Sequence, residues 1–165
     1  CGIKNLIITN SSGSLKKENP PGVLMIIKGH LDCTFQYRYQ NLQLVKDSSY
    51  YPKELISLSK RVAIENGIKV TLGNYCWVLG PIYETPEEIK YFKLNKGDAV
   101  GMSTLPEIEE ASKQGLNVLS LALLTNYAAG INKNTLSHKE VIDVALKSKT
   151  KLIKILSGII KGIRE

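Results

Sequence analysis

Short runs of apolar and β-branched residues alternate along this chain with stretches in which apolar residues recur at helical spacing. The short runs lie at residues 6–9, 23–27, 68–79, 99–100 and 118–123, and each is closed by Gly, Asn or Pro. Runs of this kind between turn residues are typical of strands. Because strands that alternate with helices form layered folds, we expect an α/β layered fold with a largely buried sheet.

The starts of two helices are marked by a capping box, in which a threonine or serine is followed three residues later by glutamate. One box is Thr85-Pro86-Glu87-Glu88, where the proline also suits the first helical position. The other is Ser137-His138-Lys139-Glu140, and apolar residues beyond it keep helical spacing to the end of the chain. This second box therefore predicts a long amphipathic helix. Two further helices are expected at residues 53–66 and 106–114, each stopped by a glycine.

The length of 165 residues suits one compact domain, and the sequence contains no internal repeat, low-complexity segment or flexible linker. Residues 29–50 form the one long stretch without a clear strand or helix pattern. Loops of more than about 12 to 15 residues in compact domains are usually functional or mobile. We expect a single domain over residues 1–165 that contains one long loop.

Composition excludes several classes of protein. Hydrophobic residues make up 43% and charged residues 22%, which excludes disordered, coiled-coil and collagen-like chains. The longest apolar runs, such as residues 118–124, are far shorter than the roughly 20 residues of a membrane-spanning helix. The chain begins with Cys1 and enters an apolar run without the pattern of a signal peptide. We expect a soluble protein whose sequence starts inside a longer one.

The cysteines and the net charge narrow the chemistry further. Cys1, Cys33 and Cys76 are too far apart in the sequence to suggest a metal site or a disulfide framework, so no metal is expected and a reducing cytoplasm fits. The net charge of +7 would suit nucleic acid, an anionic small substrate or simply solvated lysines. Because the lysines are scattered and not interleaved with aromatic residues, solvated lysines are the preferred interpretation.

Four polar or glycine-containing turns follow predicted strands, at Thr9-Asn10-Ser11-Ser12-Gly13, Gly80-Pro81-Ile82-Tyr83-Glu84-Thr85, Gly101-Met102-Ser103-Thr104 and Leu124-Thr125-Asn126. Ligands of open α/β sheets bind in the crevice beyond the strand ends, so these turns are candidates to line one site. They match neither a P-loop nor a dinucleotide fingerprint. With only two histidines and no Gly-x-Ser-x-Gly elbow in the chain, covalent catalysis is not expected.

Some of these turns belong to longer segments that occur in a characteristic order. The segments are Gly80-Pro81-Ile82-Tyr83-Glu84-Thr85, residues 98–107, Leu124-Thr125-Asn126, and residues 137–141. Their order and spacing resemble the signatures of the trimeric purine nucleoside phosphorylases that prefer 6-oxopurines, and residues 127–131 are closer to bacterial members. The resemblance is strong from Gly73 to the end and good over residues 1–27, and these residues lack the family's N-terminal phosphate-loop portion. It implies the family's fold, a mixed central β-sheet flanked by helices.

The resemblance implies a pentosyltransferase of purine salvage that needs no cofactor. Inorganic phosphate, the co-substrate, would attack the anomeric carbon of inosine or guanosine to give free purine and ribose 1-phosphate. As the glycosidic bond lengthens the base gains negative charge, so donors placed against the purine stabilise the transition state more than the ground state. The resemblance also implies a homotrimer in the cytoplasm, with no nucleic-acid or membrane partner.

The motif positions assign the catalytic roles that the resemblance implies. Asn126 would hydrogen-bond the purine at N7 and O6, Glu84 would accept from the N1 proton and the amine of guanine, and His138 would reach the ribose 5′-hydroxyl. An asparagine can donate to a 6-oxo group, whereas an aspartate there would accept from a 6-amino group. The pairing of Asn126 with Glu84 therefore predicts a preference for 6-oxopurines.

Further contacts are implied by the same alignment of motifs. Tyr83 would pack on the base, and Tyr75 would lie at the base end of the pocket. Val100 and Met102 would form apolar walls beside the base and ribose. The turn with Ser11 and Gly13 would also contact the nucleoside. Phosphate would contact Ser103 and the backbone around Ser11. These are neutral donors, and the 165 residues contain no match for the family's phosphate-binding arginine and histidine.

Structural explanations exist for several of these residues. Glu84 precedes a capped helix, where the helix dipole favours a carboxylate, and His138 can be an exposed residue at a helix start. Asn126 alone would be a turn former, while Tyr83 and Met102 would ordinarily belong to the core.

Three hypotheses follow for the chain as a whole. It is part of an active phosphorylase, or it is a fragment or homologue that binds purines without catalysis, or it is a basic nucleic-acid-binding domain without a recognition motif. A phosphate dianion in a partly dry site needs charged partners. We therefore expect no phosphorolysis from these 165 residues alone.

Overall fold

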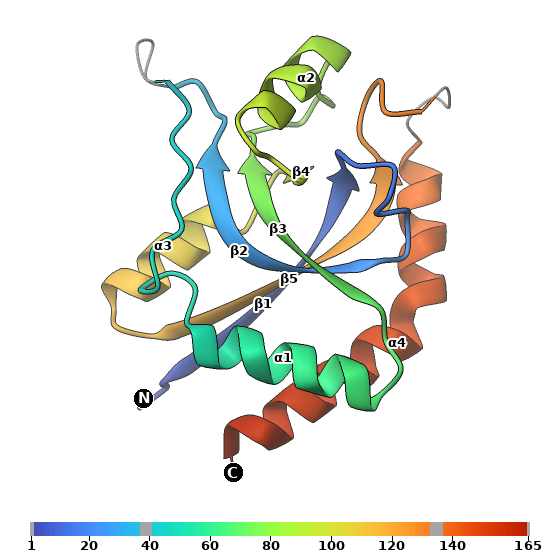
Figure 1. The fold of residues 1–165 in the computed structure, drawn as a ribbon. Helices are drawn as coiled ribbons and strands as arrows, with labels where there is room; N and C mark the ends of the chain where they lie inside the picture. The colour runs from blue at the N-terminus through green and yellow to red at the C-terminus, as the bar shows by residue number, and fades with distance from the viewer. Residues whose placement is uncertain (1, 37–40, 133–136, 165) are drawn as a thin grey trace.

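The structure, a computed structural model, describes residues 2–36, 41–132 and 137–164 (Figure 1). Within those residues the chain forms the strands and helices expected from its pattern. The strands are β1 (Asn5–Ser14), β2 (Leu24–Asp32), β3 (Val70–Trp77), β4 (Ala99–Gly101) and β5 (Asn117–Tyr127). The helices are α1 (Lys53–Glu65), α2 (Pro86–Leu94), α3 (Leu105–Lys113) and α4 (His138–Arg164).

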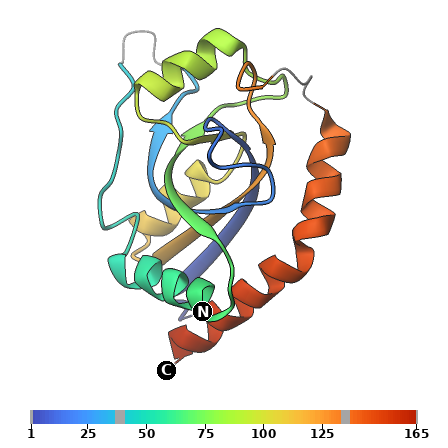
Figure 2. The ribbon, with the colours of Figure 1, turned by 45° about the vertical axis from the view of Figure 1, so that its right-hand side comes forward.

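The strands form a mixed sheet that closes into a barrel in the order β1-β4-β3-β2-β5. The pairs β1–β5, β2–β3 and β3–β4 are parallel, and the pairs β1–β4 and β2–β5 are antiparallel. Figures 1 and 2 show the curved strands in the centre, with α4 running along one side and α1 across the end near both termini. The mixed sheet and flanking helices are thus as expected, while closure of the sheet is an additional feature.

Two of the predicted turns prove to be strand. β1 and β5 pair along their whole length, from Asn5 opposite Asn117 to Ser14 opposite Tyr127, with a register shift between Ser12 and Gly13. Residues 9–13 and 124–126 therefore lie in the final parts of these strands. Each strand supplies the backbone hydrogen bonds of the other, and such a pairing cannot be recognised from the polar residues of one segment alone. β2 likewise runs on to Asp32, so the irregular stretch begins later than residue 29.

The helix signals are confirmed most clearly at α2. The Thr85 hydroxyl accepts from the backbone N–H of Glu88 at 3.3 Å, and the Glu88 carboxylate accepts from the backbone N–H of Thr85 at 2.7 Å. The two groups satisfy each other's orphan donors, as a capping box requires. The C-terminal helix α4 begins at His138, as its own box predicted, and runs for 27 residues.

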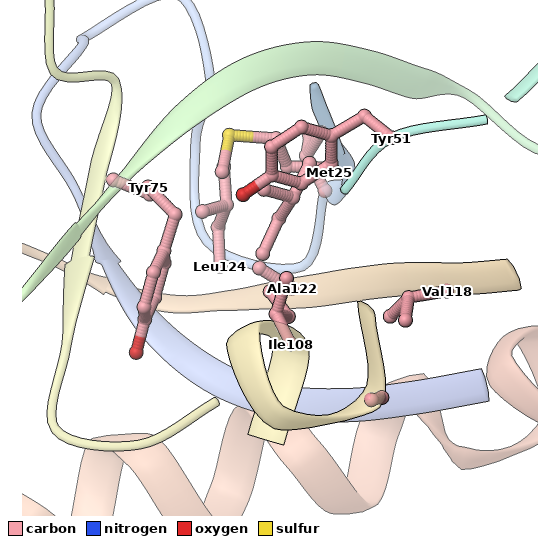
Figure 3. Packing of buried hydrophobic residues seen from close by; sticks show 11 residues of the cluster. Met25, Tyr51, Tyr75, Ile108, Val118, Ala122 and Leu124 are labelled. Carbon is pink, nitrogen blue, oxygen red and sulfur yellow. The ribbon is translucent and has the colours of Figure 1, made fainter. Parts of the chain in front are cut away.

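The buried hydrophobic residues form three clusters, and alternation of side chains along the strands separates two of them. Met25, Tyr75, Ala122 and Leu124 point into the barrel, where Ile108 of α3 joins them (Figure 3). Neighbouring positions in the sequence point outward, and there they pack beneath α1 and α4 in a second cluster that includes Leu24, Ile26, Leu119, Leu121, Ile155 and Ile159. Each fully buried side chain of this size contributes about 1.5 to 3 kcal/mol. The two layers hold the strand ends at fixed positions.

No helix in the described part of the chain is both long enough and apolar enough to span a membrane.

Candidate active site

A cleft of about 660 Å³ opens where the ends of β1, β4 and β5 meet the loop before α2 and the start of α4. All four polar segments singled out in the sequence contribute to it. Every residue predicted for the site lines this cleft except Tyr75. The lining residues are Thr9, Asn10, Ser11, Ser12, Gly13, Pro81, Tyr83, Glu84, Val100, Gly101, Met102, Ser103, Thr125, Asn126, His138 and Val141.

Asn126 is buried near the end of β5, and its amide is held in one orientation. The amide nitrogen donates to the Tyr127 carbonyl at 3.0 Å, and the amide oxygen accepts from the Thr125 hydroxyl at 3.0 Å. Gly13 faces this amide across the strand pair, where a Cβ would lie 3.3 Å from its nitrogen. Each end of the amide keeps one further bonding position, so Asn126 can offer a donor and an acceptor side by side to a ligand.

Glu84 is half-buried on the other wall of the cleft, just before the cap of α2. Burial raises the pKa of its carboxyl group above the ordinary value, and the nearby charge of Glu88 raises it further. A carboxylate that has lost part of its hydration is stabilised by a ligand that donates hydrogen bonds to it. Glu84 is therefore placed and poised to accept from N–H groups of a bound molecule.

The turn after β4 presents Ser103 to the cleft. The Ser103 side chain is exposed there, while the next residue, Thr104, is buried with φ at 84°. Gly80 packs against Met102, and a Cβ at this glycine would collide with the methionine sulfur. The loop before α2 and the turn after β4 thus fit together closely on this side of the cleft.

Tyr75 lies elsewhere than expected. Its side chain is fully buried inside the barrel, and its hydroxyl forms hydrogen bonds with the backbone of Ser103. Tyr75 therefore does not line the cleft. Sequence periodicity could not reveal this, since the side of a strand that a tyrosine occupies depends on how the sheet closes.

The start of α4 and the edge of β1 complete the lining. His138 and Val141 come from the first turn of α4, and Ser11 is exposed on β1. Among the described residues, those that line the cleft include no lysine or arginine. The site therefore combines neutral donors, one carboxylate and apolar walls, with His138 as its imidazole.

Several lining residues carried no individual prediction. Five of them lay within the polar segments already identified in the sequence, so membership of those segments was the sequence signal for them: Thr9, Asn10, Ser12, Gly101 and Thr125. Val141 showed only helical spacing, which is equally typical of a core position.

Comparisons with known proteins show the family to which the chain is related. A sequence profile described as the phosphorylase superfamily matches residues 1–161. Purine nucleoside phosphorylase 1 of Bacillus subtilis (strain 168) is 36% identical over 171 residues, which cover 96% of this chain and 61% of that protein. The probable 6-oxopurine nucleoside phosphorylase of Dictyoglomus turgidum is 34% identical over 98% of this chain and 64% of that protein.

Solved structures give the same picture at the level of the fold. Schistosoma purine nucleoside phosphorylase in complex with guanosine superposes with a TM-score of 0.85 at 28% identity, over 96% of this chain and 63% of that one. The Schistosoma mansoni enzyme in complex with inosine gives a TM-score of 0.83 over 96% and 61%. The chain spans about three fifths of the length of these relatives.

Proposed function

This chain belongs to the phosphorylase superfamily, and we propose that its cleft is the base and ribose site of a purine nucleoside phosphorylase acting on 6-oxopurine nucleosides. The observation that carries the proposal is that Glu84 and Asn126, 42 positions apart in the sequence, line the same cleft as Ser103 and His138. A volume of about 660 Å³ is within the usual range for a site that holds a small molecule. These four side chains would then face one ligand from separate walls of the cleft.

In the proposed reaction a phosphate oxygen forms a bond to the anomeric carbon as the bond from that carbon to the purine N9 breaks. The electron pair of the broken bond leaves with the base. The departing base takes up a proton from water at N7. Asn126 would donate to O6 and accept from that N7–H, and Glu84 would accept from N1–H. The donation from Asn126 to O6 strengthens as negative charge builds on the base, so it lowers the barrier more than it stabilises bound substrate.

The ribose and phosphate ends of the cleft would be served by other residues. Tyr83 would pack on the base, Val100 and Met102 would form apolar walls, and His138 would bond the 5′-hydroxyl. Phosphate would lie between Ser103 and the backbone around Ser11. We further expect the whole protein to be a cytoplasmic homotrimer, as the resemblance implies.

A second candidate function is purine binding without catalysis. It is favoured by one observation, the lack of lysine and arginine among the described residues of the cleft lining. An anionic nucleophile held only by neutral donors lacks the charge-assisted bonds that usually bind phosphate. Both candidates share the recognition of the base and differ only in the chemistry.

Base recognition can be tested on the chain itself by calorimetry with guanine, hypoxanthine and adenine. We expect the two 6-oxopurines to bind at least about tenfold more tightly than adenine, the discrimination given by correct against mispaired hydrogen bonds. Glu84→Gln should weaken guanine binding, whereas Glu88→Gln should weaken the α2 cap and leave guanine binding unchanged. Equal affinity for adenine and hypoxanthine would refute the proposed specificity.

A further inference from the structure

The contacts of Tyr75 assign it a role other than lining the cleft. Tyr75 lies on β3 opposite Ala99 of β4, among the side chains that fill the barrel with Met25 and Ile108 (Figure 3). Its ring passes beneath Gly101, where a Cβ would lie 2.5 Å from the hydroxyl oxygen. The hydroxyl therefore lies directly below the turn that carries Ser103.

Two hydrogen bonds join this hydroxyl to one residue of the turn. The Tyr75 hydroxyl donates to the Ser103 carbonyl at 2.8 Å and accepts from the Ser103 N–H at 3.3 Å. Rotation of the Ser103 backbone would break both bonds at once. Burial raises the pKa of Tyr75 to about 12, so the phenol keeps its proton and remains a donor at neutral pH.

The turn continues into Thr104, a buried residue with a strained backbone and hydrogen-bonded partners. Thr104 has φ 84° and ψ −42°, a region that β-branched residues rarely adopt. Its hydroxyl accepts from the Asn10 amide at 2.7 Å and lies 3.2 Å from the Ser103 hydroxyl, and the Asn10 amide oxygen accepts from Ser12 at 2.7 Å. Strain of this kind persists where the surroundings over-determine it, commonly at ligand sites.

We propose that Tyr75 is a positioning residue, which fixes the turn at residues 101–104 so that the Ser103 hydroxyl faces a phosphate group bound beside β1. The inference rests on the proposed function. Donors held in place before binding lose no free energy to reorganisation when an anion arrives. Because the described lining residues include no lysine or arginine, recognition of phosphate depends here on how well the neutral donors are aimed.

The test compares Tyr75→Phe with Tyr51→Phe, since each removes the hydroxyl of one buried tyrosine and keeps its ring. Tyr51 bonds Nδ1 of His30 at 2.5 Å and does not line the cleft. Dissociation constants for ribose 1-phosphate and for guanine are measured by NMR titration. Tyr75→Phe should weaken ribose 1-phosphate about fivefold, the effect of one net hydrogen bond, and leave guanine within about twofold. Tyr51→Phe should change neither constant.

A double-mutant cycle shows whether Tyr75 acts through Ser103. Ser103→Ala should weaken ribose 1-phosphate by itself, and adding Tyr75→Phe to it should cause no further loss. Hydrogen exchange gives a readout that needs no ligand. The Ser103 amide should be protected in the wild-type chain although its side chain is exposed, and Tyr75→Phe should accelerate its exchange.

Each other result overturns the inference. Equal weakening of guanine and ribose 1-phosphate by Tyr75→Phe would make the residue merely structural, and so would additive effects in the cycle. An unprotected Ser103 amide in the wild type would remove the contact itself, whether or not the variant folds. A wild-type chain that binds guanine but not ribose 1-phosphate overturns the positioning role alone, whereas one that binds neither overturns the proposed function as well.

Discussion

Asn126 is oriented by residues of its own strand. The Thr125 hydroxyl donates to its amide oxygen, and its amide nitrogen donates to the next carbonyl along the chain. An asparagine held in this way offers its remaining donor and acceptor in fixed directions. The preference for one class of purine therefore depends on an amide whose two ends are not free to exchange places.

Changing Asn126 to Asp should shift the preference of the chain toward 6-aminopurines. The aspartate has acceptors only, so it repels the 6-oxo group and accepts from a 6-amino group, with a mispairing cost of about 1 to 3 kcal/mol. Calorimetry with hypoxanthine and adenine should show the first binding less tightly and the second more tightly. Asn117→Asp, at the exposed start of the same strand, is the matched control and should alter neither affinity. Unchanged hypoxanthine affinity in Asn126→Asp would remove this residue from base recognition.

His30 is a buried imidazole away from the cleft. Its Nδ1 lies 2.5 Å from the Tyr51 hydroxyl, and burial lowers the pKa of His30 to about 4 although the charge of Asp32 opposes the shift. Burial also raises the pKa of Tyr51, so the phenol keeps its proton beside a neutral imidazole, and the tautomer of His30 decides which group donates the hydrogen bond. Burial therefore favours the uncharged form of His30 in the folded protein.

This pair should make the protein sensitive to mild acid. The unfolded chain takes up a proton on His30 near pH 6.5, whereas the folded chain does so only near pH 4, so stability falls as the pH is lowered through that window. The loss between pH 7 and pH 5 should be about 2 kcal/mol in the free energy of unfolding. Urea denaturation should show a flatter pH dependence for His30→Gln and the wild-type dependence for His138→Gln. Identical slopes for His30→Gln and wild type would contradict this assignment.

The sequence predicts the residues of the cleft better than their partners. Glu84, Asn126 and Ser103 stand in local motifs, and each of them reaches the cleft. The contacts of Tyr75 with Ser103 and of Asn10 with Thr104 span 28 and 94 positions of sequence. No local pattern encodes such pairs, because they depend on which strands become neighbours.

At the scale of elements, helices were predictable to within a residue or two because their signals are local. The capping box and the glycine stops mark their ends by hydrogen bonds made within a few positions. Strands were predictable in place but not in length. Residues 9–14 of β1 and 124–127 of β5 are polar or mixed, and they extend as strand because each supplies the other's hydrogen bonds.

The crossing of α1 and α4 depends on two glycines of α4. A Cβ on Gly158 would lie 2.5 Å from a methyl group of Val62, and a Cβ on Gly162 would lie 2.6 Å from a methyl group of Leu58. Val62 is stiff about its single side-chain torsion, whereas Leu58 can turn its methyl groups aside. The two glycines therefore permit the same close approach against neighbours of different flexibility.

Alanine at these two positions should have different effects. Gly158→Ala should lower the free energy of unfolding by about 1 kcal/mol, because overpacking against Val62 outweighs the gain of about 1 kcal/mol in helix propensity. Gly162→Ala, where Leu58 can move, should be neutral or stabilising. Urea denaturation of the two variants measures the difference. A stabilised Gly158→Ala would show that the helices can separate without cost.

For the whole molecule, closure of the sheet could not be read from the sequence. Hydrophobic spacing identifies strands and their buried faces, but the order β1-β4-β3-β2-β5 arises from pairings between distant segments. The α/β class was nevertheless predictable from strands that alternate with helices, whereas the antiparallel pairs β1–β4 and β2–β5 were not given by that alternation.

The 165 residues alone should release no measurable hypoxanthine from inosine and phosphate. The described lining residues offer hydroxyls and amides but no lysine or arginine, and the nucleophile is an anion that must be held against a carbon gaining positive charge. The assay should compare this chain with a chimera that adds the part of the Bacillus subtilis relative lying outside the matched region. Equal rates for the two would mean that the phosphate site is built from residues not recognised so far.

The pairing of β1 with β5 also sets the order in which this protein can fold. Asn5 and its partner Asn117 are 112 positions apart, so a ribosome making 5 to 20 residues per second needs roughly ten seconds between them. Throughout that interval Leu6, Ile7 and Ile8 have been synthesised without the strand that will cover them. The nascent chain therefore carries an unpaired apolar strand that binding by a chaperone would protect, and the barrel closes only when β5 emerges.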